Sequence, residues 1–256
     1  MRKSVALLLS LSVVSACGGS SDTVNISTSA LRIFSDGAGV GYLESTVNGE
    51  SRTGYVITPF LTEVLADIEG DNEVPDYTLN VPQVGTGPNT IISEGTATIE
   101  GTTVNVLAVT TTEGDVGSFV IYDPILDFSI LGTEGPIATG IPTSGDAIYA
   151  GTFGIGLRLD TSSIELGTFL ATVDFDDPTP VVDFDGFTTN YSVTGLATVS
   201  GGSFSSSLIT IETPFGGSVS GSLNGDFHDA DADDMAGVIY SNDTSGTYVG
   251  AFVGSK

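Results

Sequence analysis

The sequence is poor in several residue types that carry common protein chemistries. Its 256 residues include no tryptophan, one cysteine, one histidine and only six lysine or arginine residues. A single cysteine excludes an internal disulfide and a thiolate zinc site, and a single histidine excludes a multi-histidine metal centre. Nucleic-acid binding needs clustered basic side chains that displace counterions from phosphates, so the composition excludes nucleic-acid partners as well.

Acidic and apolar residues are what the chain has instead. Its 32 Asp and Glu residues give a formal net charge of −26, yet hydrophobic residues make up 40% and charged residues only 15%. That balance supplies enough apolar surface for a buried core and argues against charge-driven disorder. The composition therefore predicts an acidic, folded body.

Residues 1–16 have the parts of a secretory signal peptide, and the only cysteine follows them. Two basic residues precede the apolar run Val5–Val14, which is too short to span a bilayer as a helix. The run ends in Val-Ser-Ala-Cys at 14–17, which resembles the lipobox of bacterial lipoproteins. The resemblance implies cleavage before Cys17, lipidation and palmitate at Cys17, and a tether over 17–23. Gly18, in a position where Asp directs inner-membrane retention, implies the outer membrane. The alternative is an ordinary signal peptide with a coincidental cysteine.

From residue 24 onward the pattern is that of an all-β chain. Short runs of alternating apolar residues are separated by Gly, Asn, Asp, Ser and Pro. One stretch, 59–68, has helical spacing and predicts a single short helix. Around 132–146 the chain is rich in Gly, Pro, Thr and Ser, which predicts a linker between domains at 24–143 and 144–256. Strands are predicted at 30–34, 54–58, 77–81, 95–99, 104–110 and 119–121.

The C-terminal half shows the clearest strand pattern. Residues 169–175 alternate apolar and polar side chains, and 182–185 return with the same alternation after an Asp-Pro-Thr-Pro turn. Val219, Leu223 and Phe227 mark another inward row. About eight strands fit between Ile148 and Val253, the number at which an antiparallel β-barrel fills its own interior. A β-sandwich would give a similar pattern.

A family resemblance rests on these C-terminal strands. The runs GSLNGDF at 221–227, ADDMAGV at 232–238 and GTYVGAF at 246–252 resemble the last strands of the β-barrel domain of transferrin-binding protein B. Val-Asp-Phe at 173–175 and Tyr-Ala-Gly at 149–151 resemble two further strands of that domain. The resemblance implies a single lobe, with an eight-stranded antiparallel barrel preceded by a smaller handle-like β domain.

Two metal-binding interpretations fall on the same loop. Asp229, Asp231 and Asp233 have the alternating spacing of carboxylate ligands in a calcium loop. Asp234 and Tyr240, however, stand where that loop requires Gly and a bidentate Glu, so the alternative is a solvated loop on an acidic surface.

The second interpretation concerns haem iron, for which His228 and Met235 provide nitrogen and thioether ligands. The alternative is an exposed loop histidine. The acidic pairs on the predicted hairpin face solvent, and the sequence has no nucleophile elbow, phosphate-binding loop or zinc-protease motif. We therefore predict no catalytic residues and no enzyme activity.

Together these features favour an outer-membrane lipoprotein, exposed at the cell surface, that binds a ligand or partner in iron or haem acquisition. The family resemblance implies three kinds of partner: a TonB-dependent receptor, a surface lipoprotein assembly modulator, and a host or environmental iron or haem protein. The alternatives are a structural or adhesive surface lipoprotein without a small ligand, and a calcium-responsive surface module.

Overall fold

The structure is a computed structural model. It describes residues 28–35, 43–48, 77–80, 83–87, 89–99, 102–123, 128–157, 164–242 and 248–256. The predicted helix at 59–68, the predicted strand at 54–58 and Cys17 lie outside these ranges. Within them, no helix has the length and hydropathy needed to cross a bilayer.

The first half of the described chain forms one antiparallel sheet, which we call the handle sheet. Its strands run in the order β2-β1-β8-β7-β6-β5-β3, and β4 also pairs with β5. The bounds are Thr28–Ser35 (β1), Leu43–Asn48 (β2), Tyr77–Asn80 (β3), Gln83–Gly87 (β4), Thr90–Ile99 (β5), Thr102–Thr111 (β6), Gly117–Asp123 (β7) and Phe128–Gly135 (β8). Strand β8 extends into the stretch from which the sequence predicted a linker, and residues 136–145 then connect it to β9.

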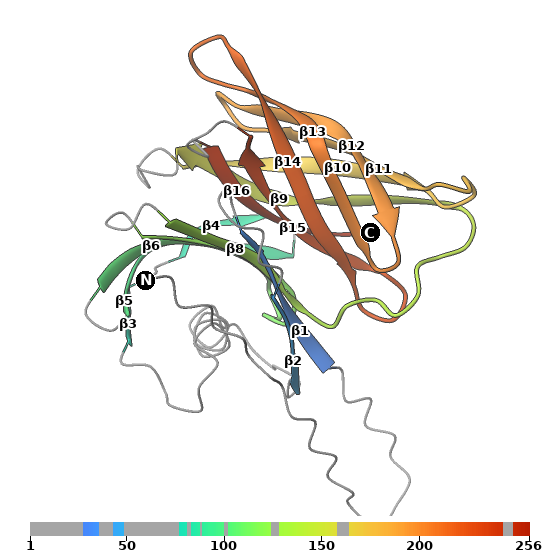
Figure 1. Cartoon of the computed structure of the whole chain (residues 1–256), viewed down its shortest axis with the longest axis horizontal. Coiled ribbons are helices and arrows are strands. Elements are labelled where there is room, and N and C mark those ends of the chain that lie inside the picture. The colour runs from blue at the N-terminus through green and yellow to red at the C-terminus, as the bar shows by residue number, and fades with distance from the viewer. Residues whose placement is uncertain are drawn as a thin grey trace, which may run out of the picture.

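The second half forms a closed barrel in which β9 pairs with both β10 and β16. The barrel prediction is therefore confirmed, and the sandwich alternative is wrong. The strands are Asp146–Leu157 (β9), Glu165–Asp174 (β10), Val181–Phe187 (β11), Ser192–Ser200 (β12), Ser203–Glu212 (β13), Ser218–His228 (β14), Asp234–Ser241 (β15) and Tyr248–Ser255 (β16). Figure 1 shows the barrel on one side of the curved handle sheet.

Aromatic side chains fill the barrel. Phe184 stacks on Phe169 with ring centroids 5.0 Å apart, and it lies 4.9 Å from Phe252; Phe204 lies 5.1 Å from Phe227. From Phe169 to the end of β10, and along β11, every second residue is buried, as the sequence alternation predicted, while the side chains between them face solvent. An eight-stranded barrel is just wide enough for its interior to be filled by side chains in this way.

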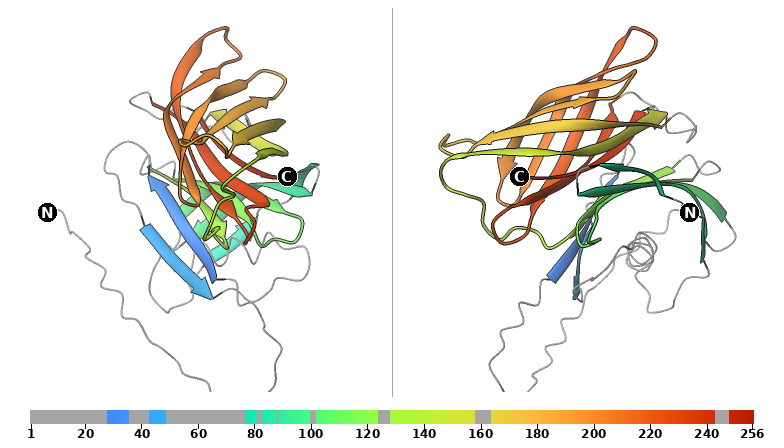
Figure 2. Two further views of the ribbon diagram at one scale, coloured as in Figure 1. Left: turned by 90° about the vertical axis from the view of Figure 1, so that its right-hand side faces the viewer. Right: turned by 180° about the vertical axis from the view of Figure 1, so that it is seen from behind.

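The barrel packs on the handle sheet through β15 and β16, which run beside the sheet in both views of Figure 2. Leu107, Val120 and Leu131 of the handle sheet share one buried apolar cluster with Val238 and Val253 of the barrel. Because one face of β15 and β16 meets the barrel core and the other meets the handle sheet, nearly all their residues are buried. Polar contacts join the two parts as well: the Ser118 hydroxyl donates to the Phe252 carbonyl at 2.9 Å, and the Thr133 hydroxyl donates to Asp226 at 2.7 Å.

Candidate functional site: a pinned acidic loop and an outer-wall groove

The loop between β14 and β15 carries most of the predicted site residues. Asp229 and Ala232 have left-handed backbone conformations, with φ of 66° and 53°, which residues other than glycine adopt at a cost. Long-range hydrogen bonds hold them there. The Asp229 amide donates to the Pro136 carbonyl at 2.9 Å, and the Tyr149 hydroxyl donates to the Ala232 carbonyl at 2.7 Å. The loop is therefore fixed by contacts to the connection after β8 and to β9.

Two carboxyl groups of this loop meet at its base. The Asp229 side chain hydrogen-bonds to that of Asp234, and the Ser255 hydroxyl donates to Asp234 as well. Burial, this hydrogen bond and the charges of Asp234, Asp115 and Asp233 raise the pKa of Asp229 to about 7. Burial and the neighbouring carboxylates also raise the pKa of Asp234. At pH values just below 7, Asp229 therefore keeps its proton and donates it in a hydrogen bond to Asp234.

Lys256 contacts two of the three residues predicted as calcium ligands. Its ammonium group donates to the Asp231 carbonyl at 2.7 Å and lies 3.1 Å from the Asp233 carboxylate. Its backbone amide donates to the Asp233 carbonyl at 2.9 Å. The side chains of Asp231 and Asp233 are exposed. In the described ranges, no group of three His, Cys, Asp or Glu side chains is arranged to hold a metal ion. Calcium binding by Asp229, Asp231 and Asp233 stays a prediction.

His228 and Met235 are both fully buried, at 0% exposure. The alternative of an exposed loop histidine is therefore wrong. His228 pairs with Asp234 on the handle-facing side of the barrel wall, next to Gly135, whereas Met235 pairs with Phe227 and belongs to the barrel core. Since they lie on opposite faces of the wall, these two side chains do not ligate one haem iron together. Ligation by either one alone stays a prediction and requires the wall to open.

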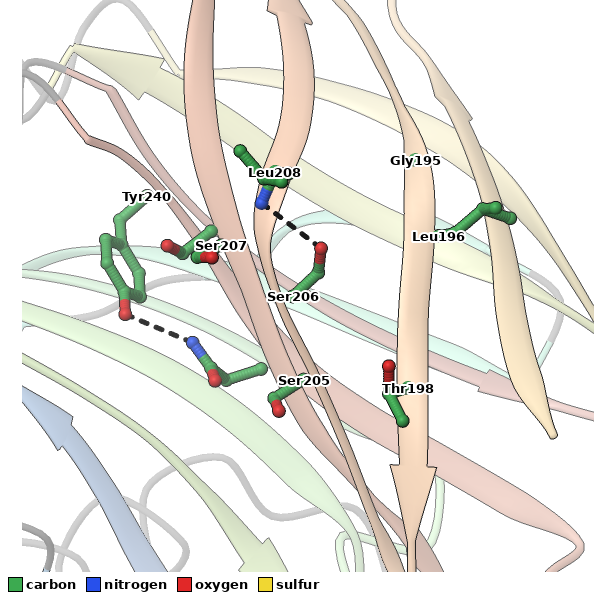
Figure 3. A pocket seen from close by; sticks show the side chains of 10 residues that line it. Gly195, Leu196, Thr198, Ser205, Ser206, Ser207, Leu208 and Tyr240 are labelled. Atoms are coloured by element: carbon green, nitrogen blue, oxygen red, sulfur yellow. Dashed lines mark hydrogen bonds between the residues drawn. The ribbon is translucent and has the colours of Figure 1, made fainter. Parts of the chain in front are cut away.

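A groove on the outer surface of the barrel is the second feature that could bind a ligand (Figure 3). Its cavity volume of about 780 Å³ is within the usual range for ligand sites. Leu208 and Leu196 stand exposed at the groove, at 80% and 57%. The lining comes from β12 to β15 and comprises Gly195, Leu196, Thr198, Ser205, Ser206, Ser207, Leu208, Ser222, Asn224 and Tyr240.

The groove forms where β13 leaves the regular ladder on both sides. Pairing with β12 shifts register between Thr194 and Thr198, and pairing with β14 shifts between Ser206 and Ile209. Two β13 residues, Ser207 and Leu208, then oppose one residue of β14, which is the arrangement of a β-bulge. Bulges re-aim side chains, and this one directs Leu208 into solvent.

Side chains stabilise the bulge in this shape. The Leu208 amide donates to the Ser206 hydroxyl at 3.2 Å, and the Asn242 amide group donates to the Ser207 carbonyl at 2.8 Å. Asn242 in turn accepts a hydrogen bond from the Ser222 hydroxyl at 2.7 Å. Beside them the Asn224 amide group donates to the Tyr240 hydroxyl at 3.1 Å. The groove is consequently preorganised.

Sequence reasoning missed both the carboxyl pair and the groove. The pair depends on a left-handed Asp229, which no local residue pattern marks. The groove has a weak signal: the segment SFSSSLITI at 203–211 contains one residue too many for strict alternation between its buried positions Phe204, Ile209 and Ile211. A strand that breaks period two in this way indicates a bulge.

No family model matches the sequence, and no curated protein matches it. Among solved structures, the chain is similar to intact Ap-TbpB with its N and C lobes, at a TM-score of 0.49 and 13% identity over 93% of this chain and 47% of that one. The chain is also similar to a transferrin-binding protein B variant from Haemophilus parasuis, at a TM-score of 0.47 and 14% identity over 90% of this chain and 45% of that one. For isotype 1 transferrin-binding protein B from serogroup B Neisseria meningitidis, the TM-score is 0.49 and the identity is 10%, over 89% of this chain and 43% of that one.

The chain therefore spans about half the length of these structures. Its handle sheet followed by a closed eight-stranded barrel is the architecture that the sequence resemblance implies.

Proposed function

We propose that this protein is a lipid-anchored outer-membrane lipoprotein, displayed at the cell surface, whose barrel binds a partner in iron or haem acquisition. The observation that carries the binding role is the preorganised groove on a barrel whose interior is already filled by aromatic side chains. Such a barrel offers its outer wall and loops, rather than its interior, to a partner.

The anchor rests on the sequence around Cys17. Several acyl chains on one residue hold a protein at a membrane far more firmly than a single chain does. The sequence Gly-Gly-Ser-Ser at 18–21 is typical of a flexible tether, and we propose that role for it. The net charge of −26 suits a body that stays soluble outside the membrane.

The anchor and the display are tested together in cells. Labelled palmitate is expected to enter the wild-type chain, to be absent from Cys17→Ser, and to be retained in the matched control Ser20→Ala. Protease added to intact cells is expected to degrade the barrel. A barrel that survives until the cells are lysed contradicts surface display.

The acquisition role is tested by growth under iron limitation. A deletion strain is expected to grow more slowly than the parent when a haem protein or a ferric-iron carrier protein is the only iron source, and equally well on inorganic iron. Purified full chain is expected to retain one of these two proteins on a surface. Equal growth on every iron source, with no retention of either protein, rules out the acquisition role.

A further inference from the structure

The groove is uncharged in a chain that is otherwise strongly acidic. None of its lining residues carries a charge, and most of them present a hydroxyl or amide group. The chain as a whole has 32 acidic residues, and the neighbouring strand β11 exposes Asp183 and Asp185. A charged ligand would therefore find no counter-charge in the groove, whereas a neutral ligand would lose no ion hydration on entering it.

The groove supplies hydrogen-bonding groups that suit a polyol. Each Ser or Thr hydroxyl both donates and accepts, and the amide of Asn224 does the same through its two ends. Thr198, Ser205 and Ser207 are exposed along the groove (Figure 3). Leu196 and Leu208 add apolar surface, against which the C–H face of a sugar ring can pack. A row of hydroxyl groups flanked by apolar side chains thus matches the two kinds of surface that a sugar chain presents.

A peptide bound as an added strand fits this place less well. Addition of a strand requires an unpaired sheet edge, and the closed barrel has none. Two backbone groups at the bulge are already used, since the Leu208 amide and the Ser207 carbonyl bond to side chains. We therefore expect the side chains that line the groove to supply most contacts to a ligand.

We propose that the groove over the β13 bulge binds a neutral oligosaccharide chain. This inference rests on the proposed function, because surface display is what exposes the groove to polysaccharide outside the cell. To the proposed function it adds a ligand class, a neutral oligosaccharide, for the outer wall of the barrel.

The test is calorimetric titration of the detergent-solubilised full chain with maltohexaose, cellohexaose and mannohexaose, and with hexagalacturonate as an anionic probe of equal length. At least one neutral hexasaccharide is expected to bind about tenfold more tightly than hexagalacturonate. Leu208→Asp, which places a charge at an exposed groove position, is expected to weaken that binding by about tenfold or more. Phe215→Asp is the matched control, since Phe215 is 84% exposed and does not line the groove.

A second variant separates hydrogen bonding from charge. Thr198→Val removes one groove hydroxyl while keeping the side-chain shape, and it is expected to weaken binding roughly two- to tenfold. Failure of all three neutral sugars to bind overturns the inference, as does equal weakening by Leu208→Asp and Phe215→Asp. The inference is also overturned if the chain binds no sugar but captures an iron or haem protein, and Leu208→Asp abolishes that capture. The groove would then dock a protein, and the proposed function would stand. Protease protection of the barrel in intact cells, by contrast, removes the proposed function itself.

Discussion

Two neighbouring stretches of the barrel wall have similar buried side chains on the inside but different exposed side chains on the outside. The outer side of β10 and β11, which we call the acidic wall, exposes Asp174, Asp183 and Asp185 and pairs without a register shift. The groove, which is lined by β12 to β15, exposes uncharged hydroxyl groups and contains two register shifts. Both stretches bury aromatic side chains on the inside. The difference shows that alternation specifies the barrel, while the outward positions and the bulge are free to specify binding.

The largest expected losses of stability come from truncating the buried aromatic side chains that both stretches have. Phe184 lies beneath the acidic wall and Phe204 beneath the groove, and both are buried in the same aromatic cluster. Phe184→Ala and Phe204→Ala are each expected to lower the free energy of unfolding by about 3–5 kcal/mol, through lost burial and the cavity left behind. Urea unfolding followed by circular dichroism measures this.

The control is Leu208→Ala, which is exposed and is expected to change the free energy of unfolding by no more than about 0.5 kcal/mol. A cost below about 1 kcal/mol for Phe204→Ala alone would mean that the interior beneath the groove is not packed like the interior beneath the acidic wall.

Replacing an inward-facing glycine with alanine is expected to destabilise the two stretches by different, smaller amounts. A Cβ added at Gly225, beneath the groove, would lie 2.4 Å from both the Ala236 carbonyl oxygen and the Phe204 ring. At Gly186, beneath the acidic wall, the nearest atoms are ring carbons at 3.0 and 3.1 Å, which can shift. Gly225→Ala is expected to cost about 3 kcal/mol and Gly186→Ala about 1 kcal/mol, measured by thermal or urea unfolding. Equal costs would show that the barrel relaxes around either methyl group.

Sequence alternation predicted most of the barrel because β10 to β13 each have one buried and one solvated face. The hairpin 169–185 and the row through Leu223 and Phe227 read directly as period two. β15 and β16 carry little such signal, because the handle sheet covers their outer face. For them the resemblance to the family's last strands, rather than periodicity, supplied the prediction.

The site was less predictable, for physical reasons that can be named. The groove depends on one extra residue in β13, which displaces Leu208 without changing the local composition. The acidic loop depends on partners distant in sequence, since Lys256 and Tyr149 hold Asp231 and Ala232. Spacing along the chain grouped Asp229, Asp231 and Asp233, whereas folding pairs Asp229 with Asp234 and leaves Asp231 and Asp233 exposed beside Lys256.

The half-buried carboxyl groups of Asp229 and Asp234 behave differently from the exposed carboxyl groups of the acidic wall. The pKa of Asp229 is about 7 in the folded chain, against an ordinary value of 3.8. Between about pH 4 and pH 7 the folded state therefore holds a proton that the unfolded state has released, so stability falls as pH rises through this window and is constant above it. Asp229→Asn keeps a residue suited to the left-handed conformation and removes the titration.

The expected result is a flatter pH profile for Asp229→Asn and a gain of about 1–2 kcal/mol at pH 8, discounted for the partial solvation of the site. Urea unfolding from pH 4 to pH 8 measures it. Asp231→Asn, an exposed position in the same loop, is the control and is expected to keep the wild-type profile. A wild-type profile in Asp229→Asn would mean that the titrating proton lies elsewhere.

The smallest expected change in the free energy of unfolding comes from exchanging side chains between the acidic wall and the groove. Asp183 and Asp185 lie two apart on one face of β11, so Asp183→Ser with Asp185→Ser removes like-charge repulsion. Ser205→Asp with Ser207→Asp introduces the same pattern at the exposed groove positions of β13. The first pair is expected to raise the free energy of unfolding by about 0.2–1 kcal/mol at low salt and the second to lower it by a similar amount, with both effects shrinking at 1 M salt.

The salt dependence is what makes this exchange informative. If the serine pair tolerates aspartate at this small, screened cost, then folding does not require the groove to be neutral, and its neutrality is available for recognition of a ligand. A loss above about 2 kcal/mol that persists at high salt would instead mean that the bulge network among Ser206, Ser222 and Asn242 needs uncharged neighbours to form. The uncharged surface would then be a requirement of the β13 bulge, and the contrast with the acidic wall would concern folding rather than binding.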